Sequence, residues 1–195
     1  GTAHCTNEFA KLKGLRPVPR ETVMAAIGLT IIDSWKMYWG EFREDWLAEY
    51  REKFRGEERK MLRLSPDTIP TLDALRGAGI KTGLVSNRQF ARNPAEYLGI
   101  AGKFDVIIGL EDVTHAKPDP EPLPTAPSRL GVEAAQAVYV GDTDIDMKTA
   151  AAAGVRGIGV TTGNFSAEQH LAAGAWRVCG SLAEAAALCG VEPRK

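Results

Sequence analysis

Short apolar runs alternate with helical patterns from about residue 80 to the end of the chain. Continuous apolar runs of this length are typical of buried parallel strands, and they occupy residues 80–85, 104–108, 137–140, 155–160 and 175–178. The patterns around them predict helices, several of them closed by glycine, at residues 66–78, 89–98, 144–153, 166–173 and 181–188. This alternation predicts an α/β fold with a doubly wound, mostly parallel sheet of the Rossmann-like kind.

The first 64 residues show helical patterns without a comparable series of strands. Six aromatic residues recur every three or four positions, which places them along one helical face: Trp35, Trp39, Phe42, Trp46, Tyr50 and Phe54. A repeating stripe of this kind is more typical of a buried seam than of a substrate-binding wall. Gly40 interrupts the stripe and predicts a break or kink, because glycine costs about 1 kcal/mol inside a helix.

Composition and charge narrow the range of functions. The 195 residues fit one domain with a sizeable insertion or two small domains. The formal net charge of -1, without a long basic run, argues against nucleic-acid or anionic-membrane partners. The three cysteines lie far from any histidine cluster and indicate neither a disulfide framework nor a zinc site, which favours a reducing compartment. No apolar run approaches the roughly 18 residues of a membrane span, and no secretory pattern opens the chain, so we expect a cytoplasmic protein.

Three aspartates follow the apolar run 137–140: Asp142, Asp144 and Asp146 in VYVGDTDIDM. Ligands of open α/β sheets bind beyond the carboxyl ends of the strands, which is where this turn is expected. A helix N-cap explains one acidic residue there through the helix dipole, but it does not explain three. Because magnesium prefers carboxylate oxygens and water, the sequence predicts a Mg²⁺ site that uses Asp142 and Asp146.

Two further segments are predicted to end at the same edge of the sheet. Ser86 and Asn87 close the strand in GLVSNR, where a hydroxyl and backbone N–H groups suit a phosphoryl oxygen, although such residues are also common turn formers. Lys117 follows the next strand, in the proline-stiffened loop HAKPDPEP. A single lysine is usually a solvated surface residue. The three segments come in order after three different strands, however, which favours one shared site.

These motifs resemble those of the haloacid dehalogenase superfamily, in particular its phosphatase branch with a helical cap inserted after the first motif, and most closely the phosphoglycolate phosphatase-like group. LVSNR is similar to the second motif, AKPDPEP to the third and VGDTDIDM to the fourth. WRVCGSLAEAAAL is similar to the family's last strand and helix. The resemblance extends over essentially the whole chain. It implies a helical cap over residues 1–64 and an α/β core over residues 65–195.

The resemblance also implies a chemistry for each motif. Ser86 would bind the transferring phosphoryl group together with Asn87, and Lys117 would neutralise the charge of that group and of the nucleophile. Asp142 would bind Mg²⁺, while Asp146 would bind it or orient its waters. The expected activity is hydrolysis of a small phosphorylated metabolite such as phosphoglycolate, through an aspartyl-phosphate, by a monomer or homodimer. The cap would close over the substrate and exclude water.

The first motif of the family, an apolar strand that ends in Asp-x-Asp-Gly-Thr, is absent. The chain begins GTAHCTNEF, in which Gly1 and Thr2 match only the tail of that motif. The missing strand would lie between the strands that lead to Ser86 and Asp142, so its absence would leave unpaired backbone groups there. We expect the natural protein to carry the nucleophilic aspartate upstream of Gly1.

The segment after Lys117 departs from the family as well. Pro124 and Pro127 lie where the family has a helix, and proline costs about 3 kcal/mol in a helix interior. We therefore expect a delayed or shortened helix in this segment.

Three other functions compete with the phosphatase. In a phospho-acceptor receiver domain the acidic pair would come early and the lysine late, which is not the order found here. A catalytically inactive module that binds metal and phosphate would lack the nucleophile but keep the other motifs. A 2-haloacid dehalogenase needs no metal, so Asp142 and Asp146 disfavour it.

Overall fold

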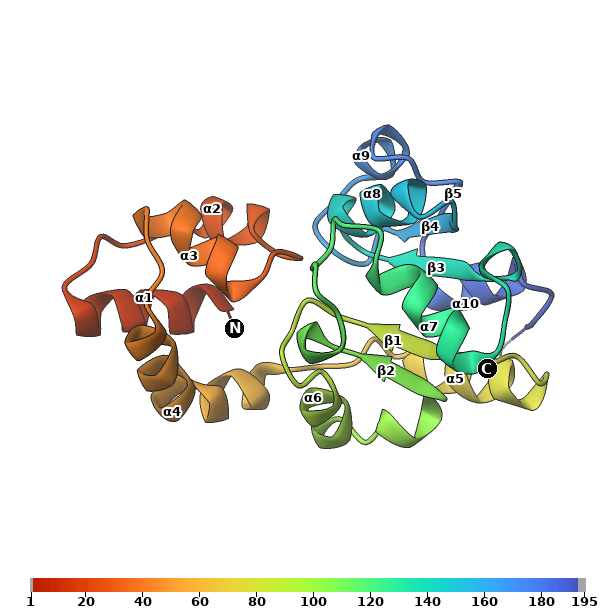
Figure 1. Cartoon of the computed structure of the whole chain (residues 1–195), viewed down its shortest axis with the longest axis horizontal. Helices are drawn as coiled ribbons and strands as arrows, with labels where there is room; N and C mark the ends of the chain where they lie inside the picture. Colours follow the sequence, from red (N-terminus) through yellow and green to blue (C-terminus); the bar gives the residue numbers. More distant parts are fainter. Residues whose placement is uncertain (1, 193–195) are drawn as a thin grey trace. The chain divides into compact units, whose positions relative to one another are not determined.

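The computed structural model describes residues 2–192 of the chain (Figure 1). It divides into two compact units, Gly1–Arg63 and Leu64–Lys195, each with its own apolar core. Of the two residues that match the tail of the first motif, Gly1 lies outside the described residues. Thr2 is the first residue of a helix. Among the described residues, no helix has both the length and the apolar character of a membrane span.

The first unit is helical. Its helices are α1 (Thr2–Lys13), α2 (Arg20–Ala25), α3 (Ile31–Trp39) and α4 (Glu44–Met61). Thr30 caps α3, because its side chain accepts the N–H of Asp33 at 3.1 Å. Gly40 ends the same helix with φ +84°, a left-handed conformation that glycine adopts without strain. The predicted break at Gly40 is therefore confirmed.

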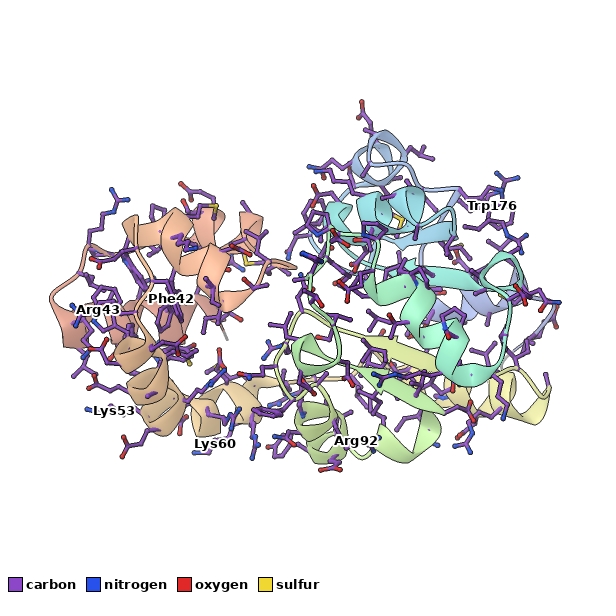
Figure 2. All side chains as sticks on the ribbon, in the orientation of Figure 1. Phe42, Arg43, Lys53, Lys60, Arg92 and Trp176 are labelled. Carbon is purple, nitrogen blue, oxygen red and sulfur yellow. The ribbon has the colours of Figure 1, made fainter. Side chains whose placement is uncertain are left out.

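Phe9 of α1 lies at the centre of the core of this unit. Its ring is fully buried and stacks on Trp35 at a centroid distance of 5.0 Å, while Tyr50 meets it edge-on at 5.5 Å. All six aromatic residues of the stripe belong to this cluster, but they lie on α3, on α4 and on the connection between them, where Phe42 is found (Figure 2). The stripe is thus a seam of packing, as predicted, but two helices form it rather than one helical face.

The second unit is an α/β fold. Its strands are β1 (Gly83–Val85), β2 (Val106–Ile108), β3 (Val138–Gly141), β4 (Arg156–Val160) and β5 (Arg177–Cys179), and the pairings described among them are parallel. Its helices are α5 (Thr68–Gly77), α6 (Arg92–Tyr97), α7 (Pro122–Leu130), α8 (Asp144–Ala152), α9 (Ala167–Ala172) and α10 (Leu182–Ala187), with the short 3-10 helices η1 (Ala101–Lys103), η2 (Leu110–Asp112) and η3 (Ala134–Gln136). The predicted strands and helices are found, and most are shorter than predicted.

The strands form two sheets. β1 pairs with β2, and β3, β4 and β5 pair in that order. Within residues 2–192, no strand is hydrogen-bonded between β1 and β3. These two strands lead to Ser86 and to Asp142, so the sheet is divided where the strand of the first motif was expected. We call this interruption the β1/β3 break. The parallel α/β fold is therefore confirmed, with its sheet in two parts.

Helix α7 passes through the proline-rich segment. Pro122 is its first residue, a position where the missing N–H has no intrahelical partner to lose. Thr125 Oγ1 donates to the carbonyl of Glu121 at 2.8 Å and adds a hydrogen bond to the first turn. The helix continues for nine residues with Pro127 inside it. Pro122 thus suits the first position of α7, and Pro127 does not end the helix, which continues to Leu130.

Strand β4 lies in the middle of the three-stranded sheet, and its glycines make room for the helices packed on it. Ile158 is fully buried. A Cβ at Gly157 would lie 3.0 Å from the side chain of Ala150 in α8, and one at Gly159 would lie 2.5 Å from the ring of His170 in α9. His170 is fully buried, and neither ring nitrogen has a hydrogen-bond partner among the described residues. The glycines therefore allow α8 and α9 to approach the sheet closely.

Candidate active site at the carboxyl ends of β1 and β3

Helix α8 begins directly after β3 with a reciprocal cap. Thr143 Oγ1 accepts the N–H of Asp146 at 3.2 Å, and Asp146 Oδ2 accepts the N–H and the hydroxyl of Thr143 at 3.1 and 2.7 Å. A side chain at position 141 would overlap Asp146, so Gly141 lets the carboxylate fold back against the end of the strand. The cap occupies Oδ2 and leaves Oδ1 for partners from other elements.

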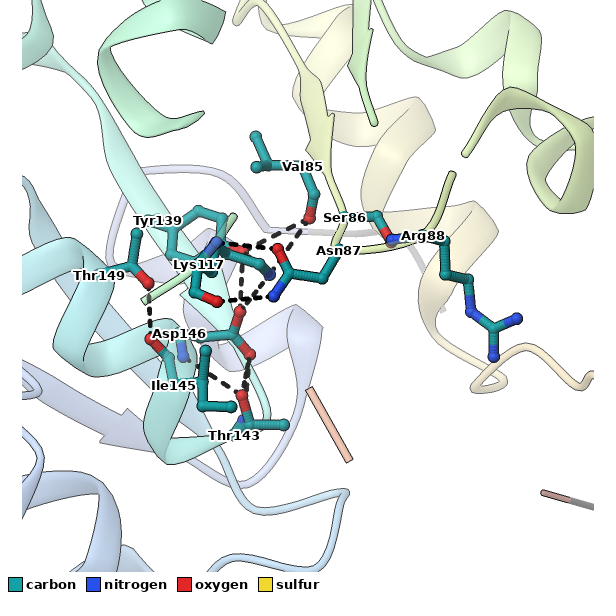
Figure 3. Close-up of polar contacts among 10 residues, drawn as sticks. All are labelled: Val85, Ser86, Asn87, Arg88, Lys117, Tyr139, Thr143, Ile145, Asp146 and Thr149. Atoms are coloured by element: carbon teal, nitrogen blue, oxygen red, sulfur yellow. Dashed lines mark hydrogen bonds and ion pairs between the residues drawn. The ribbon is translucent and has the colours of Figure 1, made fainter. Parts of the chain in front are cut away.

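Lys117 and Asp146 form a buried ion pair (Figure 3). Nζ of Lys117 lies 2.6 Å from Oδ1 of Asp146, and both side chains are at most 8% exposed. The hydroxyl of Tyr139 donates to the same oxygen at 2.9 Å. Four donor groups therefore surround a carboxylate that has about four acceptor directions.

The pKa of Asp146 reflects these contacts. Burial alone would raise it, but the charge and the hydrogen bond of Lys117, together with the two hydroxyl donors, lower it below its ordinary value. Asp146 is thus an ionised anchor for the lysine, and protein donors occupy its acceptor directions.

Asn87 places the Lys117 loop at the end of β1. Its side-chain oxygen accepts the N–H of Lys117 at 2.9 Å, and its side-chain nitrogen donates to the carbonyl of Lys117 at 2.8 Å. Nζ of Lys117 also makes a longer contact, 3.5 Å, with the carbonyl oxygen of Val85, the last residue of β1. The segments LVSNR and AKPDPEP therefore meet through direct hydrogen bonds.

Glu121 closes the base of the same loop. Its two oxygens accept the N–H groups of Thr114 and His115 at 2.7 and 2.8 Å. His115, Asp119 and Glu121 also lie near enough to share a cation, with ligand atoms within 4.8 Å of one another. The backbone contacts already give Glu121 a structural role, so we interpret this group as the closure of the loop and not as a second metal site.

Asp142 is a carboxylate that reaches solvent at the end of β3. Partial burial raises the pKa of Asp142, and the negative charge of Asp146 raises it further. A Cβ at Gly163 would lie 2.8 Å from Oδ2 of Asp142, so the turn after β4 passes close to this oxygen. A bound cation would favour the charged form of Asp142. Asp142 therefore has the charge and the solvent access that a metal ligand needs.

Ser86 and Asp144 have other partners. The N–H of Ser86 donates to the carbonyl of Ile108 at 3.0 Å, and its Oγ accepts the N–H of Arg88 at 3.2 Å. Asp144 pairs with Lys148 at 2.6 Å, one turn further along α8. Neither residue joins the Lys117–Asp146 network through a hydrogen bond in the described part of the chain.

The structure thus brings the predicted site residues together to different extents. Asn87, Lys117 and Asp146 are joined by direct contacts. Ser86 and Asp142 lie at the ends of β1 and β3, next to this group along the chain.

Sequence reasoning missed two residues of the network, Tyr139 and Thr143. Tyr139 lies inside the apolar run of β3 and follows no pattern that distinguishes it from a core residue. Thr143 opens the sequence Thr-x-x-Asp at a helix start, which is close to the pattern of a capping box. That signal identifies Thr143 from the sequence once the helix start is placed.

Comparison with known proteins decides the family. The sequence profile of the haloacid dehalogenase-like hydrolases matches residues 1–160. The chain belongs to this family. A haloacid dehalogenase-like hydrolase from Bacteroides fragilis has a solved structure that is 33% identical with a TM-score of 0.83, over 94% of this chain and 90% of that one. The resemblance seen in the motifs is therefore confirmed.

Two curated relatives of this haloacid dehalogenase-like chain have named activities. The phosphoglycolate phosphatase of Escherichia coli strain K12 is 40% identical over 102 residues, which are 51% of this chain and 40% of that protein. Pyrophosphatase PpaX of Bacillus velezensis is 34% identical over 144 residues, which are 72% of this chain and 66% of that protein. The matched part of the chain thus spans about 40% of the length of the phosphoglycolate phosphatases.

Proposed function

We propose that this protein is a Mg²⁺-dependent phosphatase that hydrolyses a small phosphorylated metabolite such as phosphoglycolate. The observation that carries the proposal is the buried Lys117–Asp146 ion pair, with Asp142 close by, where β1 and β3 end. Phosphoryl transfer depends chiefly on positioning and charge compensation. A fixed ammonium can neutralise phosphoryl charge, and a carboxylate that reaches solvent can hold a metal ion. The similarity to a phosphoglycolate phosphatase and a pyrophosphatase supports a small anionic substrate.

Each residue has a distinct role in this proposal. Lys117 neutralises charge on the phosphoryl group and on the nucleophile, and Asn87 keeps its loop in place. Asp146 holds Lys117, and because protein donors already surround its oxygens, we propose that it orients the waters of the metal ion. Asp142 holds the Mg²⁺ ion, and Ser86 binds a phosphoryl oxygen. Mg²⁺, when bound, supplies additional charge neutralisation at the phosphoryl oxygens.

The β1/β3 break is where we place the nucleophile. In the described residues β1 pairs only with β2, and β3 pairs only with β4, so the backbone groups that face the break are not paired with another strand. A parallel strand that paired with both would end at the same edge as Ser86 and Asp142. We propose that the natural protein carries such a strand upstream of Gly1, with an aspartate at its end.

The proposed reaction then has two steps. A carboxylate oxygen of that aspartate attacks phosphorus and the P–O bond to the metabolite breaks, while the second aspartate of the expected Asp-x-Asp motif gives its proton to the leaving oxygen and later takes one back from the attacking water. Water next cleaves the aspartyl-phosphate, which releases phosphate and restores the aspartate.

The helical first unit is proposed to be the cap of the family. We further propose a cytoplasmic monomer or homodimer without nucleic-acid or membrane partners, in keeping with the formal net charge of -1.

The test is hydrolysis of 4-nitrophenyl phosphate by the natural protein, including its residues upstream of Gly1, with and without Mg²⁺. We expect turnover that requires Mg²⁺ and that falls roughly 10²- to 10³-fold in Lys117→Ala. Lys81→Ala removes an exposed lysine and should keep the wild-type rate. Binding of Mg²⁺ and phosphate without turnover would instead favour a catalytically inactive binding module. Metal-independent release of halide from a 2-haloacid would favour a dehalogenase.

A further inference from the structure

Tyr139 takes part in the Lys117–Asp146 ion pair. From β3, its hydroxyl lies 2.8 Å from Nζ of Lys117 and 2.9 Å from Oδ1 of Asp146. A longer contact of 3.5 Å joins the hydroxyl to the carbonyl oxygen of Val85, across the β1/β3 break. Figure 3 shows the polar ends of the lysine, the tyrosine and the aspartate directed toward one another.

The chemistry of the three groups fixes the direction of each hydrogen bond. An ammonium can only donate and an ionised carboxylate can only accept. The hydroxyl of Tyr139 therefore accepts from Lys117 and donates to Asp146. Burial raises the pKa of Tyr139 well above its ordinary value, and the charge of Asp146 raises it further, so the hydroxyl keeps the proton that it donates. The three groups form a closed ring of contacts in which each one constrains the other two.

We propose that Tyr139 is a positioning residue for Lys117. The hydroxyl of Tyr139 directs the ammonium of Lys117 toward the ends of β1 and β3. A lysine side chain has a flexible four-carbon stem and three rotatable donors, and Asp146 alone engages only one of those donors. The hydroxyl of Tyr139 and the carbonyl oxygen of Val85 engage the others. The catalytic consequence rests on the proposed function, whereas the geometric part of the proposal stands without it.

A role in packing alone is the competing explanation for Tyr139. Its ring belongs to an apolar cluster with Ala150 and Val155, and its centre lies 5.5 Å from Nζ of Lys117. A phenylalanine ring would fill the same space, but the ammonium, which lies beyond the hydroxyl at the edge of the ring, would lose its acceptor. Tyr139→Phe therefore removes the hydroxyl and little else, which separates the two explanations.

The first measurement is chemical labelling of Lys117 in the natural protein. Reductive methylation with formaldehyde, followed at each lysine by mass spectrometry, reports how readily each amine leaves its contacts. We expect Lys117 to react about tenfold faster in Tyr139→Phe, because hydrogen bonds to charged groups are among the strongest in proteins. Lys103, which pairs with Asp73 elsewhere in the unit, should react at an unchanged rate. Equal labelling rates of Lys117 in the two proteins would overturn the proposal.

The second measurement is steady-state kinetics with 4-nitrophenyl phosphate. Tyr139→Phe is expected to lower kcat about tenfold with little change in KM, because a misdirected ammonium weakens the transition state more than substrate binding. Tyr97→Phe alters an exposed tyrosine and should match the wild type in both constants. A wild-type kcat in Tyr139→Phe would overturn the catalytic consequence. If the wild-type protein shows no turnover, the proposed function fails, and the labelling rates alone decide whether Tyr139 positions Lys117.

Discussion

Asn87 and Lys117 lie 30 residues apart in the chain, yet the side chain of Asn87 pairs with both backbone polar groups of Lys117. The two hydrogen bonds are 2.8 and 2.9 Å long, and both residues are buried. They connect the end of β1 with the loop that carries the amine of the site. One short side chain thus determines where the backbone of Lys117 lies, and the contacts of Nζ with Asp146 and Tyr139 follow from that placement.

Asn87→Asp should weaken this connection. A carboxylate can still accept the N–H of Lys117, but it faces the carbonyl oxygen of Lys117 without a proton to donate. We expect a loss of about 1–3 kcal/mol in the free energy of unfolding, measured with denaturant, together with slower hydrolysis of 4-nitrophenyl phosphate. Asn93→Asp makes the same change in the first turn of α6, where an acidic residue is tolerated, and should retain stability and rate. A fully stable and active Asn87→Asp would show that Asn87 does not hold the loop.

Gly159→Ala should destabilise the second unit. The added Cβ would lie 2.5 Å from the ring of His170, which is fully buried, so the ring or the strand would have to shift. Overpacking of this kind typically costs about 1–3 kcal/mol, which thermal or denaturant unfolding would detect. His170→Ala introduced together with Gly159→Ala should recover part of that loss, because it removes the clashing ring.

Gly77→Ala is the matched control for this substitution. Gly77 lies in α5, and a Cβ there meets nothing within 4 Å, so we expect unchanged or slightly higher stability. Equal stability of Gly159→Ala and Gly77→Ala would contradict the close packing of α9 against β4.

Asp105 should contribute to stability in a pH-dependent way. Its Oδ2 accepts the N–H of Thr82 at 2.8 Å, and this hydrogen bond, aided by Lys81, lowers the pKa of Asp105 below its ordinary value of 3.8. A carboxyl whose pKa is lower in the folded state stabilises the fold above its unfolded pKa, and this contribution is lost as the pH falls through the folded pKa. Asp105→Asn should therefore lower stability most above about pH 5 and least near about pH 2. A difference between the two proteins that stays constant across this range, measured by urea unfolding, would refute the argument.

Much of the site could be predicted because each motif follows a strand. Ser86, Lys117 and Asp142 come in order after three apolar runs, and the carboxyl ends of parallel strands share one edge of a sheet. The structure accordingly places Nζ of Lys117 2.6 Å from Asp146. The β1/β3 break also followed from the sequence, because the absent first motif removes a strand.

Other features depend on tertiary contacts that a sequence pattern does not display. Tyr139 lies within an apolar run, which does not distinguish it from a core residue, and its polar role depends on a lysine 22 residues away. The spacing of the aromatic stripe predicts a packing seam with a break near Gly40, but it does not show that two separate helices bring the two halves together around Phe9. Phe9, on which the stripe packs, carries no pattern of its own in α1.

The central claim is that Asp142 and Lys117 act on one metal ion and one phosphate in a single site. The most direct test is calorimetric titration of Mg²⁺ into the natural protein, with and without inorganic phosphate. We predict that phosphate tightens the binding of Mg²⁺, that this coupling is lost in Lys117→Ala, and that Mg²⁺ binding itself is lost in Asp142→Asn. A Mg²⁺ affinity that is the same with and without phosphate, or that is unchanged in Asp142→Asn, would contradict the claim.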